Sequence, residues 1–244
     1  MFRGAIFDVD GVLVDSPHEA AWRDALRELM EGDWADIAPR TTWTPDAFTS
    51  EVYQRVLSGK PRMSGARDAL AHFQVPDLDR HTQEYADRKQ AMIVELIERG
   101  AFRAFDDALR FVRRVRALGI PTAAASSSKN AGLMLKKIQL EDGLTLADAL
   151  DVDISGRDFA HGKPAPDIFL AAAEELGVSP EQAFVVEDAP SGVAAAKAGR
   201  MAALGVARAD DAELLHAERA DLVVTSLDQV DTAQLGEGRL RATE

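Results

Sequence analysis

Short apolar runs recur along the chain, and between most of them the apolar residues repeat with the period of a helix. The first run covers residues 4–9 and ends in the tetrapeptide Asp-Val-Asp-Gly. A short, continuously apolar run of this kind is typical of a strand that is buried on both faces of a sheet. Similar runs predict further strands at residues 120–125, 152–154, 183–187, 201–206 and 222–225.

Helical periodicity fills the intervals between the later runs. The clearest case has an apolar residue at every third position from Leu109 to Leu118. Such patterns predict helices over residues 107–118, 129–138, 167–176 and 191–198. A glycine follows each of the last two, and glycine just past a helix is a common stop signal. Strands that alternate with helices indicate an α/β fold with a doubly wound parallel sheet.

Residues 17–101 depart from this alternation because they carry almost no strand signal. Their apolar residues are spaced as in amphipathic helices, which glycine or proline interrupts at Gly32, Pro39, Pro45, Gly59, Pro61 and Pro76. The sequence therefore predicts an α/β core formed by residues 1–16 and 102–244. A helical domain, residues 17–101, is inserted after the first strand. The tail after Leu235 is expected to fray.

The amino-acid composition excludes several classes of function, and it says less about the fold. The 244 residues include no cysteine, which excludes disulfide scaffolds, zinc–thiolate sites, iron–sulfur clusters and cysteine nucleophiles. Lys and Arg number 28 against 41 Asp and Glu, which gives a net charge of −13. A protein this acidic lacks the field that attracts nucleic acid or an anionic membrane, so we expect neither partner.

The sequence contains no candidate membrane anchor or export signal. No apolar run reaches the roughly 18 residues of a membrane span. The N-terminal apolar stretch meets Asp8 too early for a signal peptide. We therefore expect a cytoplasmic protein, whose acidity is compatible with a monomer or a dimer.

Two carboxylates, Asp8 and Asp10, end the first predicted strand, and Gly11 after them permits a sharp turn. In a doubly wound sheet, ligands bind outside the carboxyl ends of the strands. The pair could bind a metal ion, or one residue could be a nucleophile and the other an acid/base. The plainer alternative is a helix-capping aspartate beside a turn aspartate.

Three further polar groups lie near the ends of later predicted strands. Residues 126–128 are serines before a helix, where hydroxyl and N–H groups form an anion site or simply cap the helix. Lys163 lies in a stiff Gly-Lys-Pro loop. It could be the counter-charge for an anion or a solvated surface lysine. Glu187 and Asp188 end another strand and suit Mg²⁺, which takes oxygen ligands. Two acidic pairs at the ends of strands bring several negative charges close together, and such a concentration of charge normally needs a cation.

In this order, the four groups resemble the four motifs of the haloacid dehalogenase superfamily of phosphotransferases. The matching segments are FDVDGVLVDS, AAASSSKN, HGKPAPD and VVEDAPSGVAAAKAG. The resemblance covers residues 1–16 and 102–228. The superfamily also places a helical cap after its first strand, where this sequence has its insertion. The resemblance therefore implies a Rossmann-like core with an inserted α-helical cap domain.

The resemblance also implies Mg²⁺-dependent phosphoryl transfer through an aspartyl-phosphate on Asp8. Asp10 would exchange protons with the leaving and incoming oxygens, and Ser126 and Lys163 would hold the transferring phosphoryl group. The implied metal ligands are Asp8, the backbone carbonyl of Asp10, Glu187 and Asp188.

Within the superfamily, the chain is most similar to the β-phosphoglucomutase-like branch, which implies a small phosphorylated metabolite, a sugar phosphate, as substrate. The implied substrate contacts are His18, Trp22, Lys60, Arg62, Ser127, Ser128, Lys129 and Asn130. Arg62 would grip a distal phosphate. The cap departs from the branch in two places. Ser58 replaces a lysine, with Lys60 as its candidate substitute, and the segment between Ser16 and His18 is two residues shorter.

The expected enzyme is thus a phosphomutase, and the alternative is a phosphatase that releases inorganic phosphate from the same kind of ester. A dehalogenase needs neither the acid/base nor the Mg²⁺ site. A phosphonatase would need a Schiff-base lysine from the cap, and neither cap lysine, Lys60 or Lys89, lies in a motif for that role. A non-catalytic binding module is disfavoured because it requires no nucleophile.

Overall fold

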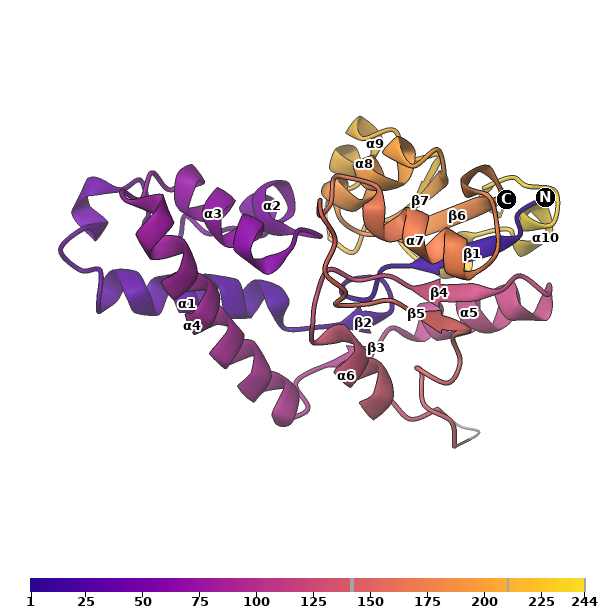
Figure 1. The fold of residues 1–244 in the computed structure, drawn as a ribbon, viewed down its shortest axis with the longest axis horizontal. Coiled ribbons are helices and arrows are strands. Elements are labelled where there is room, and N and C mark those ends of the chain that lie inside the picture. Colours follow the sequence, from indigo (N-terminus) through magenta and orange to yellow (C-terminus); the bar gives the residue numbers. More distant parts are fainter. Residues whose placement is uncertain (141–142, 210, 244) are drawn as a thin grey trace.

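The computed structural model describes residues 1–140, 143–209 and 211–243, and a parallel sheet of six strands forms the middle layer of its α/β core (Figure 1). The strands lie in the order β5-β4-β1-β6-β7-β8, so the first strand is central. Their bounds are β1 Gly4–Phe7, β4 Thr122–Ala124, β5 Val152–Asp153, β6 Ala183–Glu187, β7 Ala202–Val206 and β8 Leu222–Val224. Every pairing is parallel, which confirms the expected α/β fold class.

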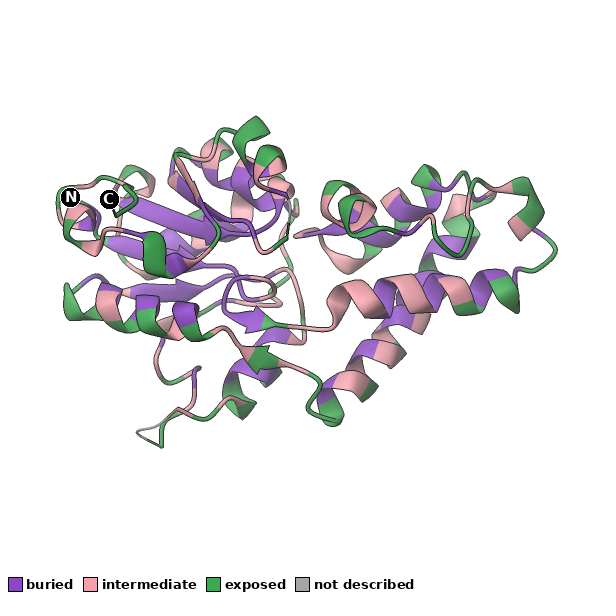
Figure 2. Cartoon of the chain, turned by 180° about the vertical axis from the view of Figure 1, so that it is seen from behind, coloured by how far each residue is buried: buried purple, intermediate pink, exposed green. Residues whose placement is uncertain are grey.

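Successive residues of the central strand enter two cores, one on each face of the sheet. Ala5 and Phe7 pack in one core, and Ile6 packs in the other. The helices are α5 (Asp106–Ala117), α6 (Ala131–Lys137) and α10 (Thr232–Leu235) on the first face, and α7 (Asp167–Glu175), α8 (Pro190–Ala198) and α9 (Ala212–Ala217) on the second. Burial on both faces, visible in Figure 2, explains the continuous apolar runs.

The inserted segment forms a separate helical unit beside the sheet, which we call the cap (Figure 1). Its elements are α1 (His18–Glu31), a 3₁₀ turn (Ala38–Arg40), α2 (Ser50–Val52), a π-helical turn (Tyr53–Leu57), α3 (Arg62–His72) and α4 (Leu78–Glu98). These helices enclose an apolar core of their own, which includes Trp22, Leu26, Phe73 and Tyr85. The amphipathic pattern of the sequence is accounted for by this core.

A two-stranded antiparallel ribbon lies where the chain passes between the sheet and the cap. β2 (Val14–Asp15) pairs with β3 (Arg103–Ala104), and Asp15 lies opposite Arg103. The two crossings of the chain are therefore adjacent. Strands of two residues are too short to show a periodicity, so the sequence did not predict them.

The predicted strands of the sheet all occur, with ends within two residues of those expected. The predicted fraying of the tail is wrong for the residues that the structure describes. Val230 forms a β-bridge with Ala242, and Thr243 N donates to Gln229 O at 2.7 Å. No helix within the described ranges has the length and apolar character that a membrane crossing requires.

Candidate active site

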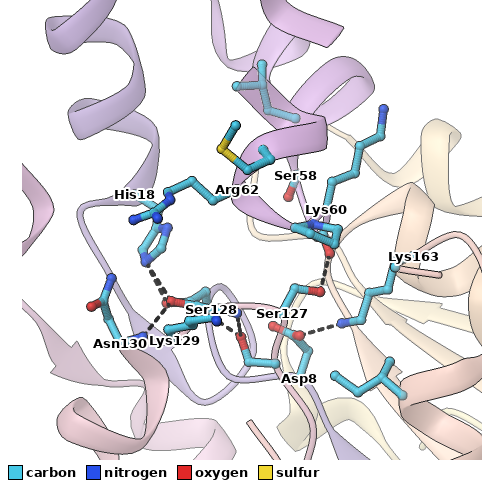
Figure 3. A pocket seen from close by; sticks show the side chains of 18 of the residues that line it. Asp8, His18, Ser58, Lys60, Arg62, Ser127, Ser128, Lys129, Asn130 and Lys163 are labelled. Carbon is cyan, nitrogen blue, oxygen red and sulfur yellow. Dashed lines mark hydrogen bonds and ion pairs between the residues drawn. The ribbon is translucent and has the colours of Figure 1, made fainter. Parts of the chain in front are cut away.

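Polar residues from both units meet at the carboxyl ends of the strands, below the cap (Figure 3). A cavity of about 280 Å³ lies there, lined by Asp8, Ser126 and Lys163 from the core and by His18 and Arg62 from the cap. This edge of the sheet is the one at which the sequence places its motifs, and it is the usual ligand-binding edge of this fold.

Lys163 is the cation at the centre of the acidic cluster. Its Nζ donates to Asp8 Oδ1 and to Glu187 Oε1, each at 2.6 Å, and its side chain is fully buried. Burial opposes the charged form, but the two carboxylates outweigh it and raise the pKa of Lys163. Lys163 is therefore a permanent positive charge beside Asp8, and not a solvated surface lysine.

Glu187 has both carboxylate oxygens engaged by the protein. Oε1 accepts from Lys163, and Oε2 accepts from the N–H groups of Asp188 and Ala189 at 3.1 Å each. A Cβ at Gly192 would lie 1.8 Å from Oε1, so the glycine lets α8 approach this close. Burial raises the pKa of Glu187, and the neighbouring Lys163 opposes that rise.

Asp188 differs because its carboxylate forms no hydrogen bond or ion pair with any residue that the structure describes. It is nevertheless 6% exposed, and burial together with the charges of Glu187 and Asp8 raises its pKa well above the ordinary value. Ligand oxygens of the three acidic residues lie within 4.8 Å of one another. This set fits a hard divalent cation. Both oxygens of Glu187 accept hydrogen bonds, whereas Lys163 engages only Oδ1 of Asp8, so Asp8 and Asp188 are the side chains that would hold the ion.

Asp10 has one oxygen bound and one left open. Ser126 Oγ donates to Oδ2 at 3.1 Å, whereas Oδ1 is buried and accepts no hydrogen bond from the described residues. His18 Nε2 lies 3.4 Å from Oδ1. Burial raises the pKa of Asp10, which favours its protonated form. These properties suit a group that gives and takes a proton.

The serine loop combines structural and functional positions. Ser128 N donates to Ser126 Oγ at 3.0 Å, and Asn130 N donates to Ser128 Oγ at 3.2 Å, so these hydroxyls also shape the turn before α6. The capping alternative thus describes part of their role. Lys129 lies at the rim of the cavity, where it pairs with Asp158 at 2.9 Å. Asn130 bonds Gln90 of the cap at 3.1 Å.

Lys89 is a cap residue whose position the sequence did not predict. It is 3% exposed, its Nζ lies 3.0 Å from His18 Nδ1, and it lies over the ring of Trp22 at 4.8 Å. Burial lowers the pKa of Lys89 to about 7 and also lowers the pKa of His18. A charged Lys89 can only donate, so the neutral imidazole then carries its proton on Nε2, which lies 3.4 Å from Ser128 Oγ.

Arg62 and Lys60 lie in different directions. Arg62 points toward His18 (Figure 3), and it forms no hydrogen bond or ion pair within the part of the chain that the structure describes. Lys60 Nζ instead donates to Asp68 Oδ2 at 2.7 Å, and its side chain runs away from Asp8. Lys60 thus lines the cavity, but its ammonium is engaged by a carboxylate of the cap.

Close contacts hold the cap loop against the core. Ser127 Oγ donates to Gly59 O at 2.9 Å, and Ser191 Oγ donates to Ser58 O at 2.6 Å. A Cβ at Gly59, where φ is +76°, would lie 2.5 Å from Ser191 Oγ. The cap is therefore closed over the cavity. Ser191 lies inside a matched motif, but only its contact with the distant cap loop shows this role.

The family of haloacid dehalogenase-like hydrolases matches residues 2–200. A β-phosphoglucomutase of Mycobacterium bovis is 35% identical over 92% of this chain and 90% of its own. A validoxylamine A 7'-phosphate phosphatase of Streptomyces hygroscopicus subsp. limoneus is 28% identical over 97% and 99%.

The fold of the chain is also similar to that of a β-phosphoglucomutase. The crystal structure of an archaeal β-phosphoglucomutase from Pyrococcus sp. strain ST 04 is 31% identical, covers 96% of this chain and 99% of its own, and superposes with a TM-score of 0.70. These similarities agree with the order of the four motifs and with the acidic cluster around Lys163. The chain is therefore an enzyme of the haloacid dehalogenase superfamily.

Proposed function

We propose that this enzyme is a Mg²⁺-dependent sugar-phosphate mutase, which passes a phosphoryl group between two hydroxyls of one hexose by way of Asp8. One observation carries the proposal. Arg62 and Lys89 reach the cavity from the cap, and neither is paired with a carboxylate of a described residue. Cations opposite the nucleophile suit a substrate that carries a second phosphate. The 35% identity to a β-phosphoglucomutase supports the same reading.

In the first half of the reaction, the Asp8 carboxylate attacks one phosphorus of the hexose 1,6-bisphosphate. A P–O bond to Asp8 forms, the bond to the sugar oxygen breaks, and Asp10 gives that oxygen its proton, so that a hexose monophosphate leaves. In the second half, the free hydroxyl of the isomeric hexose monophosphate passes its proton to Asp10 and attacks the aspartyl-phosphate, which forms the bisphosphate again. The carboxylate of Asp8 is thereby regenerated, and no co-reactant is consumed.

The surrounding residues supply charge and orientation. Lys163 stands 2.6 Å from Asp8 and would contact the transferring phosphoryl oxygens, and Ser126 holds Asp10 in place. Asp8 and Asp188 would hold Mg²⁺, with the backbone carbonyl of Asp10 as a further ligand. When bound, the ion offsets the negative charge that the carboxylates and the phosphoryl group bring together. Catalysis of this kind depends on positioning and electrostatics.

Closure of the cap decides between the two hydroxyls of a sugar and water as acceptors. The contacts of Ser127 and Ser191 with the cap loop hold the cap over the site, and a cap that excludes water would protect the aspartyl-phosphate from hydrolysis. A closed site that grips both ends of a bisphosphate therefore favours a mutase.

A sugar-phosphate phosphatase is the second candidate. One observation favours it: Lys60 is bound to Asp68, so Arg62 lacks a second cation from its own loop. A looser grip on the distal group would admit water, which would then accept the phosphoryl group through the same core residues.

A phosphorus NMR time course tests the proposal. The protein is mixed with β-glucose 1-phosphate, Mg²⁺ and a trace of the 1,6-bisphosphate. We expect glucose 6-phosphate to accumulate. Accumulation of inorganic phosphate would instead support the phosphatase. If neither signal grows, the proposed hexose substrate is wrong.

A further inference from the structure

The loop that follows Asp10 is held by an arginine that has no part in the mechanism above. Arg208 lies just beyond β7. Its Nε donates to Gly11 O and its Nη2 donates to Val12 O, each at 3.1 Å. The next carbonyl, Leu13 O, accepts from the N–H of Phe105 at 3.0 Å. Three consecutive carbonyls after Asp10 are therefore fixed from outside the loop.

The other side of Arg208 is anchored where the chain returns from the cap. Its Nη1 donates to Asp107 Oδ2 at 2.8 Å, and its guanidinium stacks on the ring of Phe105 at 3.9 Å. Asp107 Oδ2 also accepts from Leu227 N at 2.8 Å and from Ser226 Oγ at 3.0 Å, so the anchor is itself held. Phe105 directly follows the ribbon strand β3. Arg208 thus connects the Asp10 loop with the second crossing between cap and sheet.

A displacement of this loop would reach two groups of the site at once. Gly11 has a φ of +87°, in the left-handed region that favours glycine, and a Cβ there would lie 2.0 Å from Asp188 Oδ2. The backbone of Gly11 therefore lies directly against the Asp188 carboxylate. Because Asp10 immediately precedes Gly11, the same backbone sets the place of the Asp10 side chain.

We propose that Arg208 is a positioning residue for phosphoryl transfer, which fixes the Asp10 loop to residues 105–107 so that the loop keeps its geometry as the cap opens and closes. The inference rests on the proposed roles of Asp8 and Asp10. Arginine suits this task because its planar fork donates in several fixed directions and stacks on an aromatic ring. Lysine has a single ammonium, which cannot serve both carbonyls and Asp107 in the same way.

The test compares Arg208→Met and Arg208→Lys with Arg110→Met in the full chain. Arg110 is a matched control because it is another arginine of the core that bonds an aspartate, Asp228. It makes no contact with the loop that follows Asp10. The probe is hydrolysis of p-nitrophenyl phosphate with Mg²⁺, which depends on the core site and not on the identity of the sugar. Rates are measured well below each thermal transition, so that only folded protein contributes.

We expect Arg208→Met to lower kcat about 100-fold, the effect of misplacing a catalytic group by about an ångström. KM should change less than about threefold, because the loop acts on the reacting groups and not on uniform binding. Arg110→Met should stay within about twofold of wild type in both constants. A purely structural role for Arg208 would lower the thermal transition and leave kcat of the folded protein unchanged, which would overturn the inference.

Arg208→Lys keeps the charge opposite Asp107, so it remains informative if Arg208→Met does not fold. We expect about a tenfold lower kcat, because the planar fork is lost. A kcat within about twofold of wild type would contradict the inference. Asp8→Asn separates the two proposals. An active Asp8→Asn enzyme contradicts the aspartyl-phosphate itself, whereas an inactive one beside fully active Arg208 variants contradicts only the role of Arg208.

Discussion

In the core, Lys163 is paired with buried carboxylates beside the nucleophile, whereas the two cap cations that reach the cavity, Arg62 and Lys89, have no carboxylate partner among the described residues. Lys163 is bound by Asp8 and Glu187 at 2.6 Å. Arg62 has no such partner, and Lys89 bonds an imidazole. The difference supports the proposal that the core carries out the chemistry of a phosphate ester and that the cap selects the substrate by its charge.

Loss of the nucleophile Asp8 should cause the largest loss of activity. Asp8→Ala should lower turnover about 10⁴-fold or more, because the proposed covalent intermediate forms on this carboxylate. The measurement is the phosphorus NMR time course, with circular dichroism to show that the variant is folded. Turnover near that of wild type would rule out the aspartyl-phosphate.

Removal of the core cation should break the charge pairing itself. Lys163→Met leaves Asp8 and Glu187 buried without a partner, which typically costs about 3–5 kcal/mol of the free energy of unfolding. Urea denaturation measures this loss. The matched control is Lys129→Met, since Lys129 forms an exposed pair and should contribute less than about 1 kcal/mol. Equal losses for the two variants would contradict the picture of a paired core.

Removal of the cap cation should affect binding and spare the chemistry. Arg62→Ala should raise KM for the 1,6-bisphosphate about 30-fold, the loss expected for one charge-assisted contact. The same change should leave KM for p-nitrophenyl phosphate, which has no distal phosphate, nearly unaltered. Lys60→Ala is the control, because its ammonium already bonds Asp68. If the two variants behave alike, Arg62 does not grip the substrate.

The smallest expected effect is a pH dependence that comes from Lys89, which bonds His18 and is influenced by the charges of Asp10 and Arg62. Burial lowers the pKa of Lys89 to about 7, so it is charged below that pH and neutral above it. Affinity for the 1,6-bisphosphate should therefore weaken up to about tenfold between pH 6 and pH 8, as calorimetry can measure. Lys89→Met should remove this dependence and leave only the titration of the phosphates.

Stability should follow the opposite trend in the free enzyme. An unfolded lysine keeps its proton up to its ordinary pKa, whereas the folded protein releases it near pH 7. The unfolded state therefore binds more protons above pH 7, and wild type should gain stability relative to Lys89→Met as the pH rises through that range. The opposite slope in urea denaturation would show that Lys89 is charged in the folded protein.

The sequence was sufficient to predict the sheet and the core motifs, because both are properties of contiguous segments. Asp8 and Glu187 end strands of the same parallel sheet, so topology alone brings them to one edge. The remaining features depend on contacts between distant segments. Nothing within α4 distinguishes Lys89 from a surface lysine until the helix is packed against Trp22.

Lys60 in the cap loop shows the same limit. The sequence suggests that its ammonium serves the substrate, whereas the structure pairs the ammonium with another residue of the cap. The sequence predicts Lys60 as the substitute for the lysine missing at Ser58, since only two positions separate them. In the structure, Asp68 of the next helix captures its ammonium. A carboxylate eight residues away thus decides the direction of the side chain, and such competition for a partner is invisible in a motif.

The ribbon of β2 and β3 has a consequence for how this protein could be altered. Asp15 and Arg103 lie opposite each other in the ribbon and form an ion pair at 3.1 Å. The cap is therefore a closed excursion that leaves the core and returns to it at neighbouring points. A short turn could join these two ends in its place, or the helices of another relative could be spliced between them. The cap is in this sense an exchangeable module, whose replacement would leave the segments of the core that carry Asp8 and Lys163 unchanged.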